Sequence, residues 1–289
     1  MAERGNMENK KDFSLVNCIA IALLAYFFTI PFHESIHAVT HIIYGDKVEC
    51  FMSGAVSYND FVDFSTMAPI HKIMSAGSAS ILNAIIGVVL LIVLFKVRKM
   101  PAMLRLFLTM LMGGQLLEGF GYFLIGTFSI GDWGSVFRLF SDSPGASMAL
   151  RIVLGVLGFG TMVPLLYLFT YITYHFIEDP SDKAERRRVS VRLNLVLFIV
   201  AFIVGALASI NMPIVKNGEL PYWMTLFFNL MWFLYVVAFF YAWGGIMVKP
   251  PKESRIRCKL PKEAHPILWA IAVILTLIDI FIFGPGIYF

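Results

Sequence analysis

The sequence reads TIPFHESIHAVTHIIYG at residues 29–45, and this stretch closes an apolar run that begins near residue 14. It holds three histidines and one glutamate inside a segment long enough to cross a bilayer. Each ionisable side chain at the centre of a membrane helix costs roughly 3 kcal/mol, so such residues are rare and mark functional sites. The stretch therefore predicts both a membrane fold and the place of a site.

Similar apolar runs recur along the whole chain. Of its 289 residues, 58% are hydrophobic and only 15% are charged. A bilayer core about 30 Å thick needs about 20 apolar residues per helix, and breaks at Pro, Gly and charged residues divide the chain into runs of that length. We predict an all-α polytopic membrane protein with about seven transmembrane helices. Their expected ranges are 14–44, 73–95, 103–128, 150–176, 192–210, 222–247 and 266–288.

The placement of Lys and Arg predicts how these helices are oriented. Basic residues gather before the first helix and in the loops after the second, fourth and sixth, with Arg105 counted in the first of these loops. The positive-inside rule places this side in the cytoplasm, so we expect a cell-membrane protein with a cytoplasmic N-terminus. The net charge of +4 is explained by these flanks, which predicts the lipid bilayer as a partner and no nucleic acid.

We expect a chain of three parts. Residues 1–12 form a cytoplasmic tail, residues 13–147 form a membrane core that carries the pattern HExxH, and residues 148–289 add further membrane helices. No repeat or low-complexity segment in the sequence suggests a separate soluble module.

The residues His33, Glu34 and His37 form the pattern HExxH. Positions i and i+4 share one face of a helix, so both imidazoles can bind one zinc ion while the glutamate stands beside the open position of that ion. We predict Zn2+ as the cofactor, the two histidines as ligands and Glu34 as the catalytic base. His41 lies about 12 Å of helical rise beyond His33, too far to share the ion, so we expect it to face outward or to support the site.

A third ligand has to come from another helix. Two acids lie toward the same side of the membrane as HExxH: Glu118 in the outer half of the third predicted helix, and Asp132 just past its end. Glycines around Glu118 permit helices to approach closely, and glycines around Asp132 permit a turn that aims its carboxylate back at a metal. The residues by themselves do not decide which of the two acids is the third ligand.

Three motifs resemble those of the site-2 protease family, which are intramembrane zinc metalloproteases. The chain reads HESIHAVTHIIYG at 33–45, SAGSASILNAIIG at 75–87 and GDWGSV at 131–136. The family has HExxH, an Asn in a small-residue motif and an Asp followed by Gly on its first three helices. The resemblance covers roughly residues 14–137 and implies that the first three helices form a site-2-protease-like catalytic core. It also implies Asp132 as the third zinc ligand, with Glu118 as the alternative, and Asn83 as a substrate-binding residue.

The function that follows is that of a zinc-dependent metalloendopeptidase acting on membrane-associated protein substrates. Zinc lowers the pKa of its bound water to about 7, and Glu34 takes the proton of that water and hands it to the leaving amine. Residues 47–64 alternate loosely between apolar and polar, which predicts a hairpin that holds an unwound substrate by strand addition. An ordinary loop there, and a helix-packing role for Asn83, are the alternatives.

Two further functions use the same residues. One is a zinc-dependent membrane hydrolase that acts on a lipid or an isoprenoid. The other is a non-catalytic metal-binding membrane protein or transporter, which has no need of a base such as Glu34.

Overall fold

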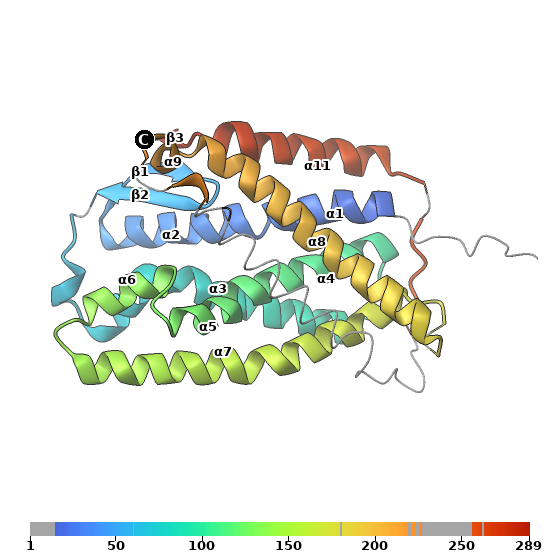
Figure 1. Cartoon of the computed structure of the whole chain (residues 1–289), viewed down its shortest axis with the longest axis horizontal. Coiled ribbons are helices and arrows are strands. Elements are labelled where there is room, and N and C mark those ends of the chain that lie inside the picture. The colour runs from blue at the N-terminus through green and yellow to red at the C-terminus, as the bar shows by residue number, and fades with distance from the viewer. Residues whose placement is uncertain are drawn as a thin grey trace, which may run out of the picture.

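A computed structural model describes residues 15–59, 61–179, 181–218, 221–223, 226, 256–261 and 263–289. The protein is mostly helical, and its long helices run side by side along one axis (Figure 1). The predicted tail 1–12 and nearly all of the predicted helix 222–247 lie outside the described residues.

The described helices follow the predicted apolar runs. In chain order they are α1 (Leu15–Phe27), α2 (Ile30–Tyr44), η1 (Phe64–Thr66), α3 (Pro69–Lys96), α4 (Ala102–Leu116), the π-helical turn η2 (Leu117–Gly121), α5 (Tyr122–Gly126), α6 (Asp132–Leu139), α7 (Pro144–Thr173), η3 (Tyr174–Phe176), α8 (Lys183–Asn211), α9 (Pro213–Lys216), α11 (Pro266–Ile278) and the π-helical turn η4 (Asp279–Phe283).

Several of these helices are long and apolar enough to cross a membrane. In the part of the chain that the structure describes there are five such stretches: Leu15–Tyr44, Pro69–Lys96, Ala102–Gly126, Pro144–Thr161 and Pro266–Phe283. The C-terminal part of α8, Leu195–Asn211, is a shorter apolar helix. The chain therefore has the architecture of a multi-pass membrane protein, and the total of seven helices stays a prediction.

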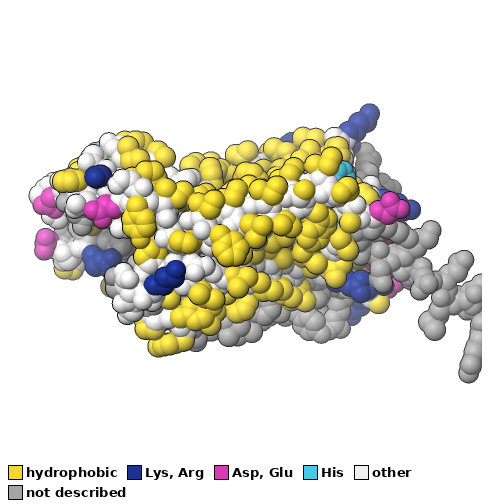
Figure 2. Space-filling model, turned by 90° about the horizontal axis from the view of Figure 1, so that it is seen from above, with side chains coloured by type: hydrophobic (Ala, Val, Ile, Leu, Met, Phe, Trp, Pro, Cys, Tyr) yellow, Lys and Arg dark blue, Asp and Glu magenta, His cyan; other side chains and the backbone are white. Residues whose placement is uncertain are grey.

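The surface of the helical bundle is apolar along its middle. Figure 2 shows hydrophobic side chains over most of one long face, with acidic and basic side chains gathered mainly toward its two ends. The outward side chains Ile267, Ile271 and Ile274 of α11 and Phe281 of η4 are all exposed. Apolar side chains that face outward over this length suit contact with lipid tails.

The interior is organised around α1. This helix packs against α4, α8 and α11. Ile21 and Ala25 of α1, Leu106 and Met110 of α4, and Leu193 of α8 belong to one buried cluster. Because neighbours surround it on several sides, α1 buries most of its residues, whereas α11 leaves a wide face exposed.

A small sheet corrects the prediction of an all-α fold. Strands β1 (Lys47–Met52) and β2 (Ala55–Asn59) form an antiparallel hairpin, which confirms the hairpin predicted within 47–64. A short strand β3 (Ile287–Tyr288) pairs antiparallel with β1, so the strand order is β2-β1-β3. The predicted helix 266–288 is therefore too long at its end. Helical structure stops at Phe283, because the Gly-Pro-Gly sequence that follows includes a proline without an N–H and Gly286 with φ of 89°.

The first predicted helix is interrupted at Phe28 and Thr29, between α1 and α2. Pro31 lies in the first turn of α2, where its missing N–H is tolerated. Gln115 of α4 donates from Nε2 to the Phe28 carbonyl at 3.0 Å, and Thr29 donates from Oγ1 to the Ala25 carbonyl at 2.7 Å. A backbone group freed within a membrane needs such a partner, so these side chains stabilise the break.

Candidate metal centre

Helix α2 carries the HExxH residues on a face turned into the protein. His33 and His37 are 2% and 8% exposed, and their rings lie edge to face with centroids 4.9 Å apart. The helix is regular from Ile30 to Tyr44, which confirms that the two imidazoles share one face. In Figure 1, α2 continues α1 along the long axis of the bundle, with the break at Phe28 and Thr29 between them.

Asp132 is the first residue of α6 and follows a sharp turn. Gly131 has φ of 67°, a conformation that favours glycine. The next residue, Trp133, is 2% exposed and lies against two glycines: a Cβ at Gly77 of α3 or Gly126 of α5 would come within 2.9 or 2.7 Å of its side chain. These glycines leave room for the indole, which anchors α6 and so places Asp132 facing α2.

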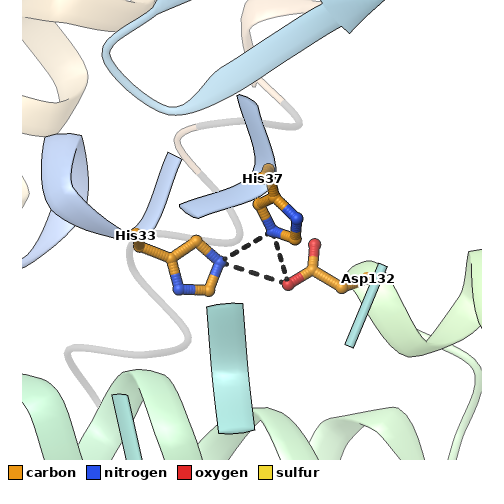
Figure 3. Close-up of side chains that lie close together, drawn as sticks. All are labelled: His33, His37 and Asp132. Atoms are coloured by element: carbon orange, nitrogen blue, oxygen red, sulfur yellow. Dashed lines mark hydrogen bonds and ion pairs between the residues drawn. The ribbon is translucent and has the colours of Figure 1, made fainter. Parts of the chain in front are cut away.

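The three side chains converge on one point (Figure 3). Nε2 of His33 lies 3.2 Å from Nε2 of His37, and each of these nitrogens lies 3.2 Å from Oδ2 of Asp132. A tetrahedral zinc ion with bonds of about 2.0–2.1 Å keeps its ligand atoms about 3.3 Å apart. The triangle therefore has the size that such an ion requires, and the group can hold a metal. Two imidazoles and one carboxylate suit Zn2+, and also other divalent metals such as Fe2+.

Helix α3 supplies two polar side chains beside the ligands. Nδ2 of Asn83 lies 3.0 Å from Nδ1 of His33, and Ser80 donates from Oγ to Oδ2 of Asp132 at 3.4 Å. Both side chains are fully buried. The Asn83 Oδ1 atom is buried with no hydrogen-bond partner among the described residues. A histidine that ligates through Nε2 carries its proton on Nδ1 and offers the donor that this oxygen lacks, so the surroundings fit a metal.

Sequence reasoning placed Asn83 at the site and missed Ser80. A signal for Ser80 was present, because positions 80 and 83 are one helical turn apart and share a face. Nothing in the sequence shows that this face meets the ligands.

Glu34 lies next to His33 on α2 and is 9% exposed. It interacts electrostatically with both histidines and with Asp132, yet it is not part of the triangle of ligand atoms. No other described residue donates a hydrogen bond to its carboxylate. The carboxylate is therefore free to accept a proton from a water molecule at the site.

Glu118, the alternative third ligand, lies in the π-helical turn η2 and is half-buried. Of the two acids, the described structure brings Asp132 and not Glu118 into the ligand triangle. The same turn packs directly on α3, since a Cβ at Gly119 would lie 2.5 Å from the Cα of Ala84. Turns of this kind are often found at functional sites, and this one presses η2 against the residue that follows Asn83.

Of the two places predicted for His41, the outward-facing one is wrong. His41 is 3% exposed, and its Nδ1 lies 2.7 Å from Oδ2 of Asp46. Oδ1 of Asp46 accepts hydrogen bonds from the backbone N–H groups of Phe61 and Val62, and the His41 ring stacks on Tyr58 of β2. The carboxylate after the helix end attracts the imidazole inward, so this pair ties the β-hairpin to α2 one turn beyond His37.

The three predicted metal ligands thus come together from segments about a hundred residues apart in the chain. Comparison of the chain with models of protein families, with curated protein sequences and with solved structures found no match. The candidate metal centre is therefore defined by its own geometry, and the resemblance to site-2 proteases stays a prediction.

Proposed function

We propose that this protein is an intramembrane zinc metalloprotease that hydrolyses peptide bonds of membrane-associated proteins, as its resemblance to site-2 proteases implies. The observation that carries the proposal is the triangle of His33, His37 and Asp132, with edges of 3.2 Å and Glu34 beside it. Its support comes from the residue types together: two neutral nitrogen ligands, one anionic ligand, and one carboxylate outside the ligand set that can serve as a base.

The chemistry consumes one water molecule. Bound zinc supplies a Lewis acid that polarises the scissile carbonyl and makes water a stronger acid. Glu34 accepts one proton as the water oxygen bonds to the carbonyl carbon, and it returns that proton to the nitrogen as the carbon–nitrogen bond breaks. The products are a carboxylic acid and an amine, so atoms and charge balance without any other reactant.

The β-hairpin favours a peptide over a lipid as the substrate. In the described sheet β1 is the central strand, and the outer edge of β2 pairs with no other strand. A strand edge presents backbone N–H and C=O groups that pair with an extended peptide, and a lipid chain has no such groups. The stacked pair His41 and Tyr58 holds β2 against the helix that carries HExxH. When a helical segment of a membrane protein unwinds, it loses its backbone hydrogen bonds, and pairing with this edge replaces them.

The experiment measures zinc content and cleavage of an unstructured reporter peptide for the detergent-purified full chain. The variant Glu34→Gln keeps the shape of the side chain and removes the base. We expect about one zinc per chain in the wild type and in the variant, with cleavage lowered about 10²- to 10⁴-fold in the variant. The matched control is Glu178→Gln, which makes the same change at an exposed position and leaves both quantities unchanged.

Three results would contradict the proposal. If the purified wild type contains no zinc, the candidate metal centre is not a zinc site. If Glu34→Gln binds zinc and cleaves the peptide as fast as the wild type, Glu34 is not the catalytic base. Zinc binding without peptide cleavage, but with release of a fatty acid or an alcohol from added lipid or isoprenoid ester, identifies a lipid hydrolase instead.

A further inference from the structure

Asn83 is fully buried next to a metal ligand, and its own hydrogen bonds are incomplete. Its Nδ2 atom lies 3.0 Å from Nδ1 of His33, the ring nitrogen that points away from the ligand triangle. Its Oδ1 atom is buried with no partner among the described residues. An amide oxygen in such a place needs a donor within reach.

Metal ligation by His33 provides that donor. A neutral imidazole carries one proton, and ligation through Nε2 leaves it on Nδ1. A half-turn of the Asn83 carboxamide exchanges the places of its oxygen and nitrogen, so that Oδ1 accepts the hydrogen bond from Nδ1–H. After this rotation the oxygen has a hydrogen-bond donor, and Nδ2 takes the former place of Oδ1. The contact is thus suited to His33 as a ligand through Nε2, and its length of 3.0 Å needs no further movement.

The position of Asn83 is set by close helix packing. Ala84, the next residue of α3, meets the backbone of η2 at Gly119, where any side chain would come within 2.5 Å of it. One turn earlier on α3, Ser80 contacts the Asp132 carboxylate. One face of α3 therefore touches two of the three ligands, and the packing leaves it little freedom to move away from them.

We propose that Asn83 is a positioning residue: its side-chain oxygen holds the proton of His33 on Nδ1 and fixes the ring so that Nε2 faces the metal. The inference rests on the metal centre of the proposed function and not on the reaction that follows. It differs from the substrate-binding role that the resemblance implies for Asn83. The side chain is fully buried, and one of its two amide atoms is taken up by the contact with His33, which favours the positioning role over contact with a substrate.

The test measures the zinc dissociation constant of the full chain in detergent, by competition with a chromophoric chelator. Asn83→Ala removes the acceptor and is expected to weaken zinc binding about 10- to 100-fold. Asn83→Asp keeps an acceptor oxygen at the same place and is expected to bind zinc as tightly as the wild type or more tightly. The matched control, Ser78→Ala, removes the hydrogen bond between the hydroxyls of Ser78 on α3 and Thr40 on α2 without touching a ligand, and leaves zinc affinity unchanged.

A second readout reports the ligand geometry and does not depend on catalysis. With Co2+ in place of zinc, visible absorption distinguishes tetrahedral from higher coordination. We expect the wild type and Asn83→Asp to share one spectrum, and Asn83→Ala to show an altered one. Should Asn83→Ala not fold, the nitrogen NMR signals of histidine-labelled wild type with zinc decide, since a ligating ring protonated on Nδ1 and protected from exchange is expected.

The outcomes separate this inference from the proposed function. Tight zinc binding by the wild type with equal affinity in Asn83→Ala, or a His33 ring without a proton on Nδ1, overturns the positioning role and leaves the protease untouched. Weakened zinc binding in Asn83→Ala, rescued in Asn83→Asp, supports it even if the wild type cleaves no peptide. A wild type that binds no zinc overturns both.

Discussion

The two ends of the helical bundle both bury polar side chains, but they use them differently (Figure 1). At one end the side-chain atoms of His33, His37 and Asp132 converge on a single point. At the opposite end Arg105 and Asn17 direct their hydrogen bonds to several separate backbone groups. Convergence suits the binding of an ion, whereas dispersed contacts with the main chain stabilise the ends of helices.

Arg105 shows how the second kind works. The sequence placed it among the charges of the loop after the second helix, and this is wrong, because the side chain is fully buried. It donates to the carbonyls of Leu94, Val97 and Arg98 at the C-terminal end of α3. The last carbonyls of a helix have no partner within the helix, so the guanidinium supplies one and also complements the helix dipole.

Asn17 plays a similar part on α1. Its Nδ2 group donates to the carbonyls of Pro261 and Glu263, and its Oδ1 accepts from the N–H of His265. These contacts tie the segment that leads into α11 to the start of α1. At this end both kinds of amide atom have backbone partners, whereas the oxygen of Asn83 at the candidate metal centre has none among the described residues.

The largest expected effect distinguishes Asp132 from Glu118 as the third ligand of the candidate metal centre. Asp132→Ala removes one of three ligands, so zinc content should fall from about one per chain to near zero, and peptide cleavage should be lost. Glu118→Ala leaves the triangle complete and should keep its zinc. Metal analysis of both purified variants makes the measurement. Zinc retained by Asp132→Ala and lost from Glu118→Ala would show that the wrong acid is in the ligand set.

A large effect of another kind is expected from Arg105→Leu. The change removes the donor to the carbonyls of Leu94, Val97 and Arg98 and should lower the free energy of unfolding by about 3 kcal/mol, with zinc content unchanged. Thermal unfolding in detergent, with metal analysis in parallel, measures both. Arg105→Lys keeps the charge but not the forked donors, so its free energy of unfolding should lie between those of the wild type and Arg105→Leu. If Arg105→Leu folds fully but loses its zinc, the two ends of the bundle do not have separate roles.

Removal of the metal should lower the free energy of unfolding only through the loss of zinc from His33, His37 and Asp132. When free zinc stands at 100 times its dissociation constant, chelation should lower the free energy of unfolding by about 2.7 kcal/mol. In Asp132→Ala, chelation should change nothing, whereas Arg105→Leu should lose as much as the wild type. Unfolding curves at fixed free zinc concentrations test this. An equal loss in Asp132→Ala would mean that zinc binds elsewhere.

The smallest effect is expected from Asn17→Ala, which removes the contacts between α1 and the segment before α11. The cost should be about 1–2 kcal/mol, since only neutral hydrogen bonds are lost. Asn59→Ala, the same change at an exposed position at the end of β2, serves as the control and should cost less than about 0.5 kcal/mol. Unfolding midpoints at equal zinc suffice, and equal values for the two variants would remove the structural role of Asn17.

The sequence by itself determined the membrane character of the chain, the HExxH face and the β-hairpin. These features depend on local patterns: the length of apolar runs, the spacing of four residues on a helix, and alternation along a strand. His33, Glu34 and His37 could be read from one helix because neighbouring positions on a helix have fixed geometry. The ends of elements were less certain, as the break at Phe28 and Thr29 shows.

The tertiary structure alone decided which acid completes the triangle, what surrounds it and which charges are buried. Asp132 joins His33 because Trp133 fits between two glycines of other helices. Asn83 and Ser80 meet the ligands because α3 packs closely on η2, and Arg105 is buried because the end of α3 lies beside the start of α4. Each of these contacts joins residues distant in the chain, and their energies depend on distances that no local pattern of residues specifies.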